Sequence, residues 1–151
     1  MASQPGLFAL MFVAGCAVPT MAAINASLGA RLGSPLVAVF VLCTVASLVA
    51  GLGLLVSTQR GAGWTDVPAW QWAGGVLFLV YIFSATYAVP HIGLGNAIFL
   101  VLLGQLVTAA AIDHFGWLGA QVAPLSARRA LGLVIMAIGV MLARRDVLPG
   151  T

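Results

Sequence analysis

The sequence predicts an all-α integral membrane protein, a bundle of five transmembrane helices in a single domain of residues 1–151. The composition is the first observation: 62% of residues are hydrophobic and 6% are charged, against roughly 45–50% and about 25% in soluble domains. A soluble protein of this size could not bury so much apolar surface in one core. The second observation is a series of uncharged apolar runs of about 20 residues, the length of a membrane-spanning helix. Strands of a barrel would alternate polar and apolar residues instead.

Five apolar segments are the predicted spans, with approximate bounds at residues 7–28, 36–56, 70–88, 94–112 and 128–142. Pro19 lies in the middle of the first span, and residues 31–35 form a tight turn before the second. Residues 57–68 form the clearest polar loop. The tryptophans near its end are typical of an aromatic belt at the lipid headgroups; they are Trp64, Trp70 and Trp72.

The third and fourth spans are predicted to be separated by a break at Pro90, Gly93 and Gly95. Small residues recur within several spans and favour close approach of helix backbones. The pairs are Ser47 with Gly51, Ala46 with Ala50, and Gly132 with Gly139. Such pairs indicate a helix bundle, without indicating what the bundle does.

Few residues in the chain can carry chemistry. The net charge of +3 comes from six arginines, which are scattered and form no patch for nucleic acid. Cys16 and Cys43 lie inside apolar runs and lack the spacing of metal ligands, so we expect packing residues and no disulfide. No basic segment precedes Leu7, so we expect no cleaved signal peptide. No catalytic set of side chains occurs, so we expect no enzyme, no cofactor and no metal.

The arginines do not select an orientation in the membrane. With five spans, one side of the membrane receives Arg60, Arg128 and Arg129, and the other receives Arg31, Arg144 and Arg145. The positive-inside rule counts basic residues on short loops, and here the count is tied. One interpretation is insertion in both orientations with antiparallel pairing, and the other is a single orientation fixed by the translocon or by a partner.

Polar residues inside the spans are candidates for a substrate path, because they are costly in lipid. Ser84, Tyr87 and His91 share one stripe of the third span, with Tyr81 one turn earlier. Gln105 and Thr108 share a face of the fourth span. Asn25, near the end of the first span, either lines the path or bridges two helices by a hydrogen bond. Tyr81 and Tyr87 could likewise be interface anchors.

Asn96 is expected to have a different role from Gln105. The two residues are nine positions apart, which at about 100° per residue places them on opposite faces of the helix. We therefore expect Asn96 to cap the fourth helix after the break.

The middle of every span lacks a charged residue. The ionisable candidates are His91, Asp113 and His114, all near span ends. The last two form either a proton relay or a pair that caps a helix at the interface. The absence of a central carboxylate argues against a cation-selective pump, and favours a neutral or weakly polar substrate or an anion bound by helix N-termini.

Several short motifs resemble the YdcZ-type inner-membrane family of the drug/metabolite transporter superfamily, and the resemblance covers nearly the whole chain. They are Asn25, Pro90-His91-Ile92-Gly93, Gly104-Gln105, Asp113-His114-Phe115-Gly116, Pro124-Leu125-Ser126 with Arg129 and Gly132, and Gly139-Val140. The resemblance implies a five-helix unit similar to one half of the ten-helix (EamA-like) transporters of that superfamily. Those larger chains look like two five-helix repeats in opposite orientation. It also implies a multi-pass protein of the inner (plasma) membrane that exports small molecules.

The sequence thus leads to one hypothesis, a secondary transporter working by alternating access as an antiparallel homodimer in the lipid bilayer. The predicted substrate-binding residues are Asn25, Tyr81, Ser84, Tyr87, Gln105 and Thr108. The predicted coupling or gating residues are Pro19, Pro90, His91, Asp113 and His114. The alternatives are a non-transporting scaffold or modulator subunit and one half of a heterodimeric transporter.

Overall fold

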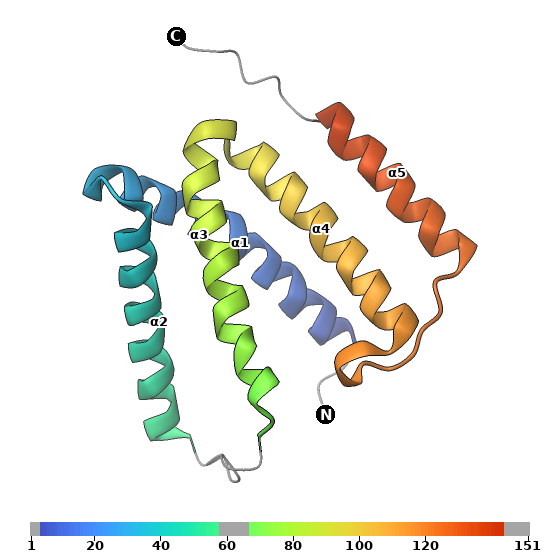
Figure 1. The fold of residues 1–151 in the computed structure, drawn as a ribbon, viewed down its shortest axis with the longest axis horizontal. Coiled ribbons are helices and arrows are strands. Elements are labelled where there is room, and N and C mark those ends of the chain that lie inside the picture. The colour runs from blue at the N-terminus through green and yellow to red at the C-terminus, as the bar shows by residue number, and fades with distance from the viewer. Residues whose placement is uncertain (1–3, 58–66, 144–151) are drawn as a thin grey trace. The chain divides into compact units, whose positions relative to one another are not determined.

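The computed structural model describes residues 4–57 and 67–143, and these residues form α-helices and short 3₁₀ turns (Figure 1). The α-helices are α1 (Gln4–Leu32), α2 (Pro35–Val56), α3 (Ala73–Ile92), α4 (Leu94–Phe115) and α5 (Ala127–Ala143). The 3₁₀ turns are η2 (Ala69–Trp72) before α3 and η3 (Trp117–Gly119) after α4. The chain divides into two compact units, Met1–His91 and Ile92–Thr151.

Four of the described helical segments are long and apolar enough to cross a membrane. They are Gln4–Leu32, Pro35–Val56, Ala69–Ile92 and Leu94–Phe115. The fifth helix, α5, has 17 residues within the described part of the chain, which is at the short end of the usual range of roughly 17–25 residues. The predicted all-α membrane fold is confirmed, and the single domain stays a prediction.

The turn between α1 and α2 follows from three consecutive residues. Gly33 has a φ of +66°, a conformation that glycine adopts at little cost and that ends α1. The Ser34 hydroxyl then caps α2 by accepting a hydrogen bond from the backbone N–H of Val37. Pro35 occupies the first helical position, where its missing N–H removes no helical bond. The chain therefore reverses direction within two residues.

The first unit packs through small side chains on α1, and these were not the pairs that the sequence suggested. Its buried positions on α1 are Ala22, Asn25, Ala26 and Gly29; on α2 they are Ala38 and Val39; on α3 they are Ile82, Ala85 and Thr86. A Cβ at Gly29 would lie 3.3 Å from Cγ2 of Thr86 and 3.4 Å from the Cα of Pro35. Glycine at this position therefore allows the three helices of this unit to approach closely.

The small-residue pairs singled out from the sequence do not pack within the described part of the chain. A Cβ added at Gly51, Gly132 or Gly139 would meet no atom within 4 Å. Ser47, Ala46 and Ala50 on α2 are likewise exposed. Small residues recur in most membrane helices, so the spacing alone could not show which pairs contact a neighbouring helix.

The break between α3 and α4 lies at one residue, Gly93, and not across the whole predicted segment. Pro90 lies inside the last turn of α3, and Gly95 lies inside α4. Gly93 has a φ of +80° and is the N-cap of α4, without a side chain to accept a hydrogen bond. The prediction that Asn96 caps α4 was therefore wrong. Its amide Nδ2 instead donates to the carbonyl oxygen of Ile92 across the break, at 2.9 Å.

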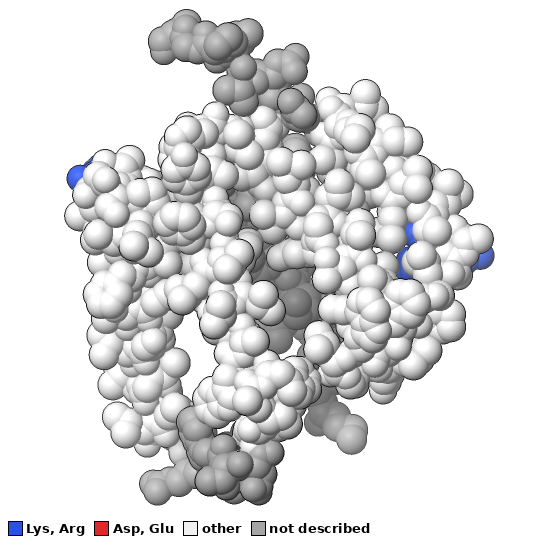
Figure 2. Space-filling view, in the orientation of Figure 1, with Lys and Arg blue, Asp and Glu red and all other residues white. Residues whose placement is uncertain are grey.

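The described arginines lie at helix ends, where membrane proteins commonly keep basic residues. Arg31 is in the last turn of α1, and Arg128 and Arg129 are in the first turn of α5. In the face drawn in Figure 2, basic side chains lie over the turn between α1 and α2 and near the start of α5. Arg60, Arg144 and Arg145, which complete the tied count, lie outside the described residues, as does Trp64.

Candidate functional site

A hydrogen bond between Asn25 of α1 and Thr86 of α3 connects two helices inside the first unit. Both residues are almost fully buried, with exposed fractions of 2% and 1%. The Thr86 hydroxyl donates its single proton to the carbonyl oxygen of Ile82, at 2.7 Å. Thr86 can therefore only accept from Asn25, so the amide nitrogen of Asn25 faces Thr86. This bond is the helix bridge that was one of the two interpretations of Asn25.

The carbonyl oxygen of the Asn25 side chain has no hydrogen-bond partner among the described residues. Among those residues, no fully buried side-chain polar atom lacks a partner, so Oδ1 of Asn25 keeps some accessible surface. Asn25 also lines a cavity. The helix bridge is therefore present, and Oδ1 is the polar atom of this side chain that the bridge leaves unused. A role for Asn25 in a substrate path stays a prediction.

Two cavities of the first unit bear on the site. The larger of these two has a volume of about 740 Å³, is open on one side and lies between α1 and α2, with Phe78 of α3. Its lining is mostly apolar and includes Met21, Ile24, Leu28, Val41, Leu42 and Val45. The polar exceptions are Thr20 and Asn25, together with the thiol of Cys16. Thr20 donates its hydroxyl proton to the Cys16 carbonyl at 3.0 Å. Pocket dimensions of this order are typical of small-molecule sites.

A smaller cavity of about 340 Å³ lies beyond the bridge, near the turn between α1 and α2. Its lining includes Thr86 and three of the predicted residues, Tyr87, Pro90 and His91. Asn25 lines the larger cavity and Thr86 lines the smaller one, so the hydrogen bond between them lies between the two cavities.

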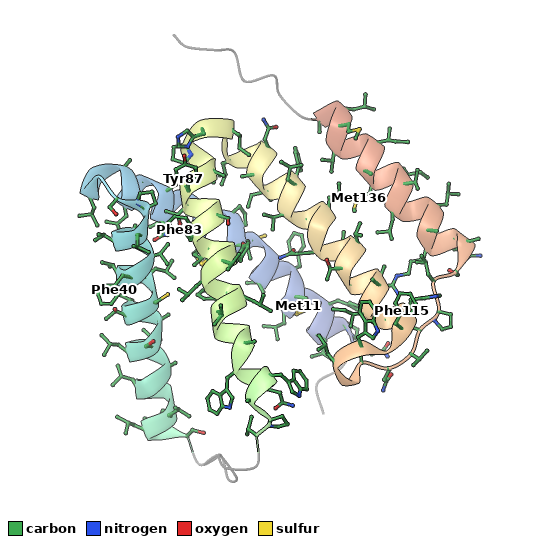
Figure 3. All side chains as sticks on the ribbon, viewed as in Figure 1. Met11, Phe40, Phe83, Tyr87, Phe115 and Met136 are labelled. Atoms are coloured by element: carbon green, nitrogen blue, oxygen red, sulfur yellow. The ribbon has the colours of Figure 1, made fainter. Side chains whose placement is uncertain are left out.

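An aromatic row follows the exposed face of α3. The rings of Phe83 and Tyr87 are stacked with centroids 6.4 Å apart (Figure 3), and the rings of Tyr87 and His91 are 4.8 Å apart. Nδ1 of His91 lies 2.7 Å from the Tyr87 carbonyl oxygen, which can only accept. Nδ1 of His91 therefore carries the proton of this bond, and in the neutral ring Nε2 is left as an acceptor.

The other predicted binding residues are dispersed. Ser84 is exposed and Tyr81 is partly buried on α3, and neither lines one of the two cavities. Gln105 and Thr108 are exposed on α4, which belongs to the second unit. Pro19 lies within α1 and is partly buried. Of the predicted residues, the structure therefore places Asn25 at one cavity and Tyr87, Pro90 and His91 at the other.

Asp113 and His114 organise the connection between α4 and α5 in the second unit. Oδ2 of Asp113 accepts from Nη2 of Arg129 at 2.7 Å. Nδ1 of His114 accepts from the backbone N–H of Leu125 at 2.9 Å. The Ser126 hydroxyl accepts from the backbone N–H of Arg129 at 3.2 Å and so caps α5. Asp113 therefore has a structural partner in the first turn of α5, and His114 has one in the loop.

Sequence reasoning missed Thr86, Phe78 and Gly29 as parts of the site. Thr86 was visible as a polar residue of the third span, but the stripe through Ser84 and Tyr87 drew attention to the opposite face. Phe78 and Gly29 carry no local signal, because only the packing of three helices brings them to the cavities. Among the described residues, no group of three or more His, Cys, Asp or Glu side chains could hold a metal ion.

Comparison with known proteins finds a family whose model matches the chain. The family model described as "Putative inner membrane exporter, YdcZ" matches residues 6–142 of the chain. No curated protein and no solved structure matches the chain. The description is of an inner-membrane exporter family and names no enzyme activity, and it implies a lipid environment and small-molecule substrates. The match spans all five helices, and the chain therefore belongs to the YdcZ family of multi-pass inner-membrane proteins.

Proposed function

We propose that this chain is a secondary transporter that exports a small molecule by alternating access, as an antiparallel homodimer. The observation that carries the proposal is the Asn25–Thr86 hydrogen bond between two cavities of the first unit. A single polar contact between apolar helices can hold one arrangement and release another at a cost of about 1 kcal/mol. Its position fits a gate that separates two compartments of a path.

The proposed path combines the polar residues of both units. Asn25, Tyr81, Ser84, Tyr87, Gln105 and Thr108 would contact the substrate. Gln105 and Thr108 support a dimer, because both are exposed on the apolar helix α4. Polar side chains that face lipid are costly, and a second copy would cover them. In this proposal the two units of each copy act as one transmembrane domain.

The proposed moving parts lie at helix irregularities. Pro19 leaves the carbonyl of Gly15 without its usual helical donor, and Pro90 does the same for the carbonyl of Thr86. Such positions bend more readily than a regular helix. His91 would act at the gate through the smaller cavity. Asp113 and His114 would act by fixing the connection between α4 and α5.

Labelling of single cysteines from one side of the membrane tests the antiparallel arrangement. Leu32→Cys, at the end of α1, and Gln121→Cys, between η3 and α5, would lie on opposite sides of a five-span chain. Each is placed in a chain with Cys16→Ala and Cys43→Ala, and intact cells are treated with a membrane-impermeant maleimide. We expect comparable partial labelling of both sites, rising to completion after permeabilisation.

Labelling of only one site in intact cells would contradict the antiparallel arrangement. If one site is labelled fully in intact cells and the other only after permeabilisation, every copy has the same orientation and the antiparallel homodimer is wrong. A scaffold subunit or a hetero-pair would then account for the exposed polar face of α4. Leu48→Cys, near the middle of the exposed apolar side of α2, provides a control that should stay unlabelled in both conditions.

A further inference from the structure

We infer that the larger cavity binds an uncharged, largely apolar molecule through a hydrogen-bond donor of that molecule, such as a hydroxyl or an N–H group. This inference rests on the proposed function and names the class of substrate. It follows from which polar atoms reach the cavity and which of them are already engaged.

The direction of the hydrogen bonds makes Asn25 an acceptor toward the cavity. Thr86 has given its proton to Ile82, so it takes one from the amide nitrogen of Asn25. The amide oxygen therefore points away from Thr86, and it has no partner among the described residues. An acceptor that is largely removed from water and has no partner gives up part of its hydrogen bonding, at a cost of up to roughly 1–3 kcal/mol when it is fully buried. A ligand that supplies a proton would remove that cost.

Thr20 presents the same chemistry to the cavity. Its hydroxyl proton is donated to the Cys16 carbonyl one turn earlier, so only the lone pairs of Oγ1 remain for a ligand. Thr20 and Asn25 both line the larger cavity, at positions five residues apart on α1. Two acceptors that line the same cavity can each receive a donor from a ligand.

The lining excludes charged ligands. Within the described part of the chain, the residues that line the larger cavity include no Lys, Arg or His to pair with an anion, and no Asp or Glu to pair with a cation. An isolated charge in an apolar site loses its hydration without compensation. Phe78, Met21 and the aliphatic side chains of α1 and α2 offer contact to an apolar body instead.

Other occupants fit this chemistry less well. A lipid acyl chain would fill the apolar part and leave Oδ1 of Asn25 without a donor. A helix of a second copy could fill the cavity and would exclude small molecules from it. The occupant that matches both the apolar lining and the unpartnered acceptor is a small molecule with a donor group.

Three naphthalene derivatives of similar size test the inference on the full-length purified protein. 2-Naphthol has a donor, 2-methoxynaphthalene lacks it, and 2-naphthoate is an anion. Equilibrium dialysis with radiolabelled 2-naphthol, corrected with protein-free micelles, gives the free concentration of each competitor needed for half displacement. We expect 2-naphthol to displace the label at a concentration about tenfold lower than 2-methoxynaphthalene, and 2-naphthoate to be weaker still. Tenfold corresponds to about 1.4 kcal/mol, the size of one hydrogen bond.

Variants of Asn25 and Thr20 test whether these two acceptors cause the preference for 2-naphthol over 2-methoxynaphthalene. The ratio of the half-displacement concentrations of the ether and the alcohol, about ten in the wild type, should fall about threefold in Asn25→Leu. Because this change also removes the bridge to Thr86, Thr20→Val is the second variant, since it keeps the shape of an exposed side chain while removing the acceptor. We expect Thr20→Val to reduce the ratio by about threefold. Thr44→Val on α2 is the control, because Thr44 also donates to a backbone carbonyl but does not line the cavity.

Several results would overturn the assignment: no saturable binding of 2-naphthol, equal displacement by the ether, preference for the anion, or an unchanged ratio in both variants. The binding assay needs neither transport nor a particular orientation. A donor preference together with labelling from one side only would remove the antiparallel transporter and leave the site. Labelling from both sides with equal binding of alcohol and ether would remove the site and leave the transporter.

Discussion

Arg129, in the first turn of α5, holds the carboxylate of Asp113 near the end of α4, with 2.7 Å between Nη2 and Oδ2. The two side chains are about one third exposed. Around them, the backbone N–H of Ala123 donates to the Asp113 carbonyl oxygen at 2.8 Å. The ion pair therefore connects the two helices of the second unit on either side of a loop that is itself hydrogen-bonded to α4.

Loss of this ion pair should have a small but specific effect. We expect Arg129→Ala to lower the free energy of unfolding by about 0.5 kcal/mol, because water screens pairs of this exposure. The measurement is titration with SDS in mixed micelles. Exchange of the charges in Asp113→Arg with Arg129→Asp should restore part of the loss. Arg128→Ala is the matched control, since Arg128 has no ion pair within the described residues; an equal loss there would contradict the prediction.

The Asn25–Thr86 hydrogen bond between α1 and α3 should contribute more to the free energy of unfolding than the Asp113–Arg129 ion pair does. Thr86→Val removes the acceptor and leaves the amide nitrogen of Asn25 buried without a partner. We expect a loss of about 1–2 kcal/mol in the free energy of unfolding, measured by the same titration. Thr86→Ser keeps the hydroxyl and should lose about half as much or less. Ser84→Ala, on the exposed face of α3, should change little. Equal stability of the Val and Ser variants would show that the bond is not stabilising.

Sequence reasoning predicted the helices well because each helix is encoded locally. The uncharged apolar runs fix the spans, and Gly33, Ser34 and Pro35 specify the first turn by their own backbone preferences. It failed at Pro90 because a proline near the C-terminal end of a helix removes only one helical bond, so α3 continues for two further residues to Ile92. The residue that ends the helix is Gly93, with its positive φ.

The site was only partly predictable because it depends on contacts between helices. Asn25 was identified as a polar residue in an apolar span, but its partner Thr86 lies 61 positions away. No periodicity within either helix relates the two. The same holds for Gly29, because its lack of a side chain matters only where Thr86 and Pro35 approach it from other helices. Gln105 was singled out for its position in an apolar run, and its role in transport stays a prediction.

A side chain at Gly29 should separate the helices of the first unit. A Cβ there would lie 3.3 Å from Cγ2 of Thr86, and the branches of valine would come closer still. We expect Gly29→Val to lower the free energy of unfolding by about 1–3 kcal/mol. Gly15→Val on the same helix is the control, because a Cβ at Gly15 would meet no atom within 4 Å. A loss at Gly15 equal to that at Gly29 would attribute the effect to helix propensity instead.

Gly116 should be required at the end of α4 for two separable reasons. Its φ of +64° costs about 1 kcal/mol for a residue with a Cβ, and that Cβ would lie 2.6 Å from Cγ2 of Val122. We expect Gly116→Ala to lower the free energy of unfolding by about 1–2 kcal/mol. Adding Val122→Ala should recover the steric part and leave the backbone part. Gly104→Ala, in the open interior of α4, should be neutral or slightly stabilising.

Replacement of Gln105 by leucine distinguishes a residue of the substrate path from a residue of the dimer interface. Gln105 is exposed on α4, so in the membrane its amide must be covered by protein or reach water. If it lines the path, Gln105→Leu should abolish protection of cells against any toxic compound that the wild-type chain exports. Cross-linking should then show an unchanged dimer.

Val107→Leu, also exposed on α4, controls for a change of bulk on this helix. In the opposite pattern, cross-linking yields fewer dimers, and the dimers that still form continue to protect the cells. That result would place Gln105 in a helix contact. Full protection with a normal dimer would remove Gln105 from the site altogether. The path would then depend on the residues of the first unit, where Asn25 and Thr86 separate the two cavities.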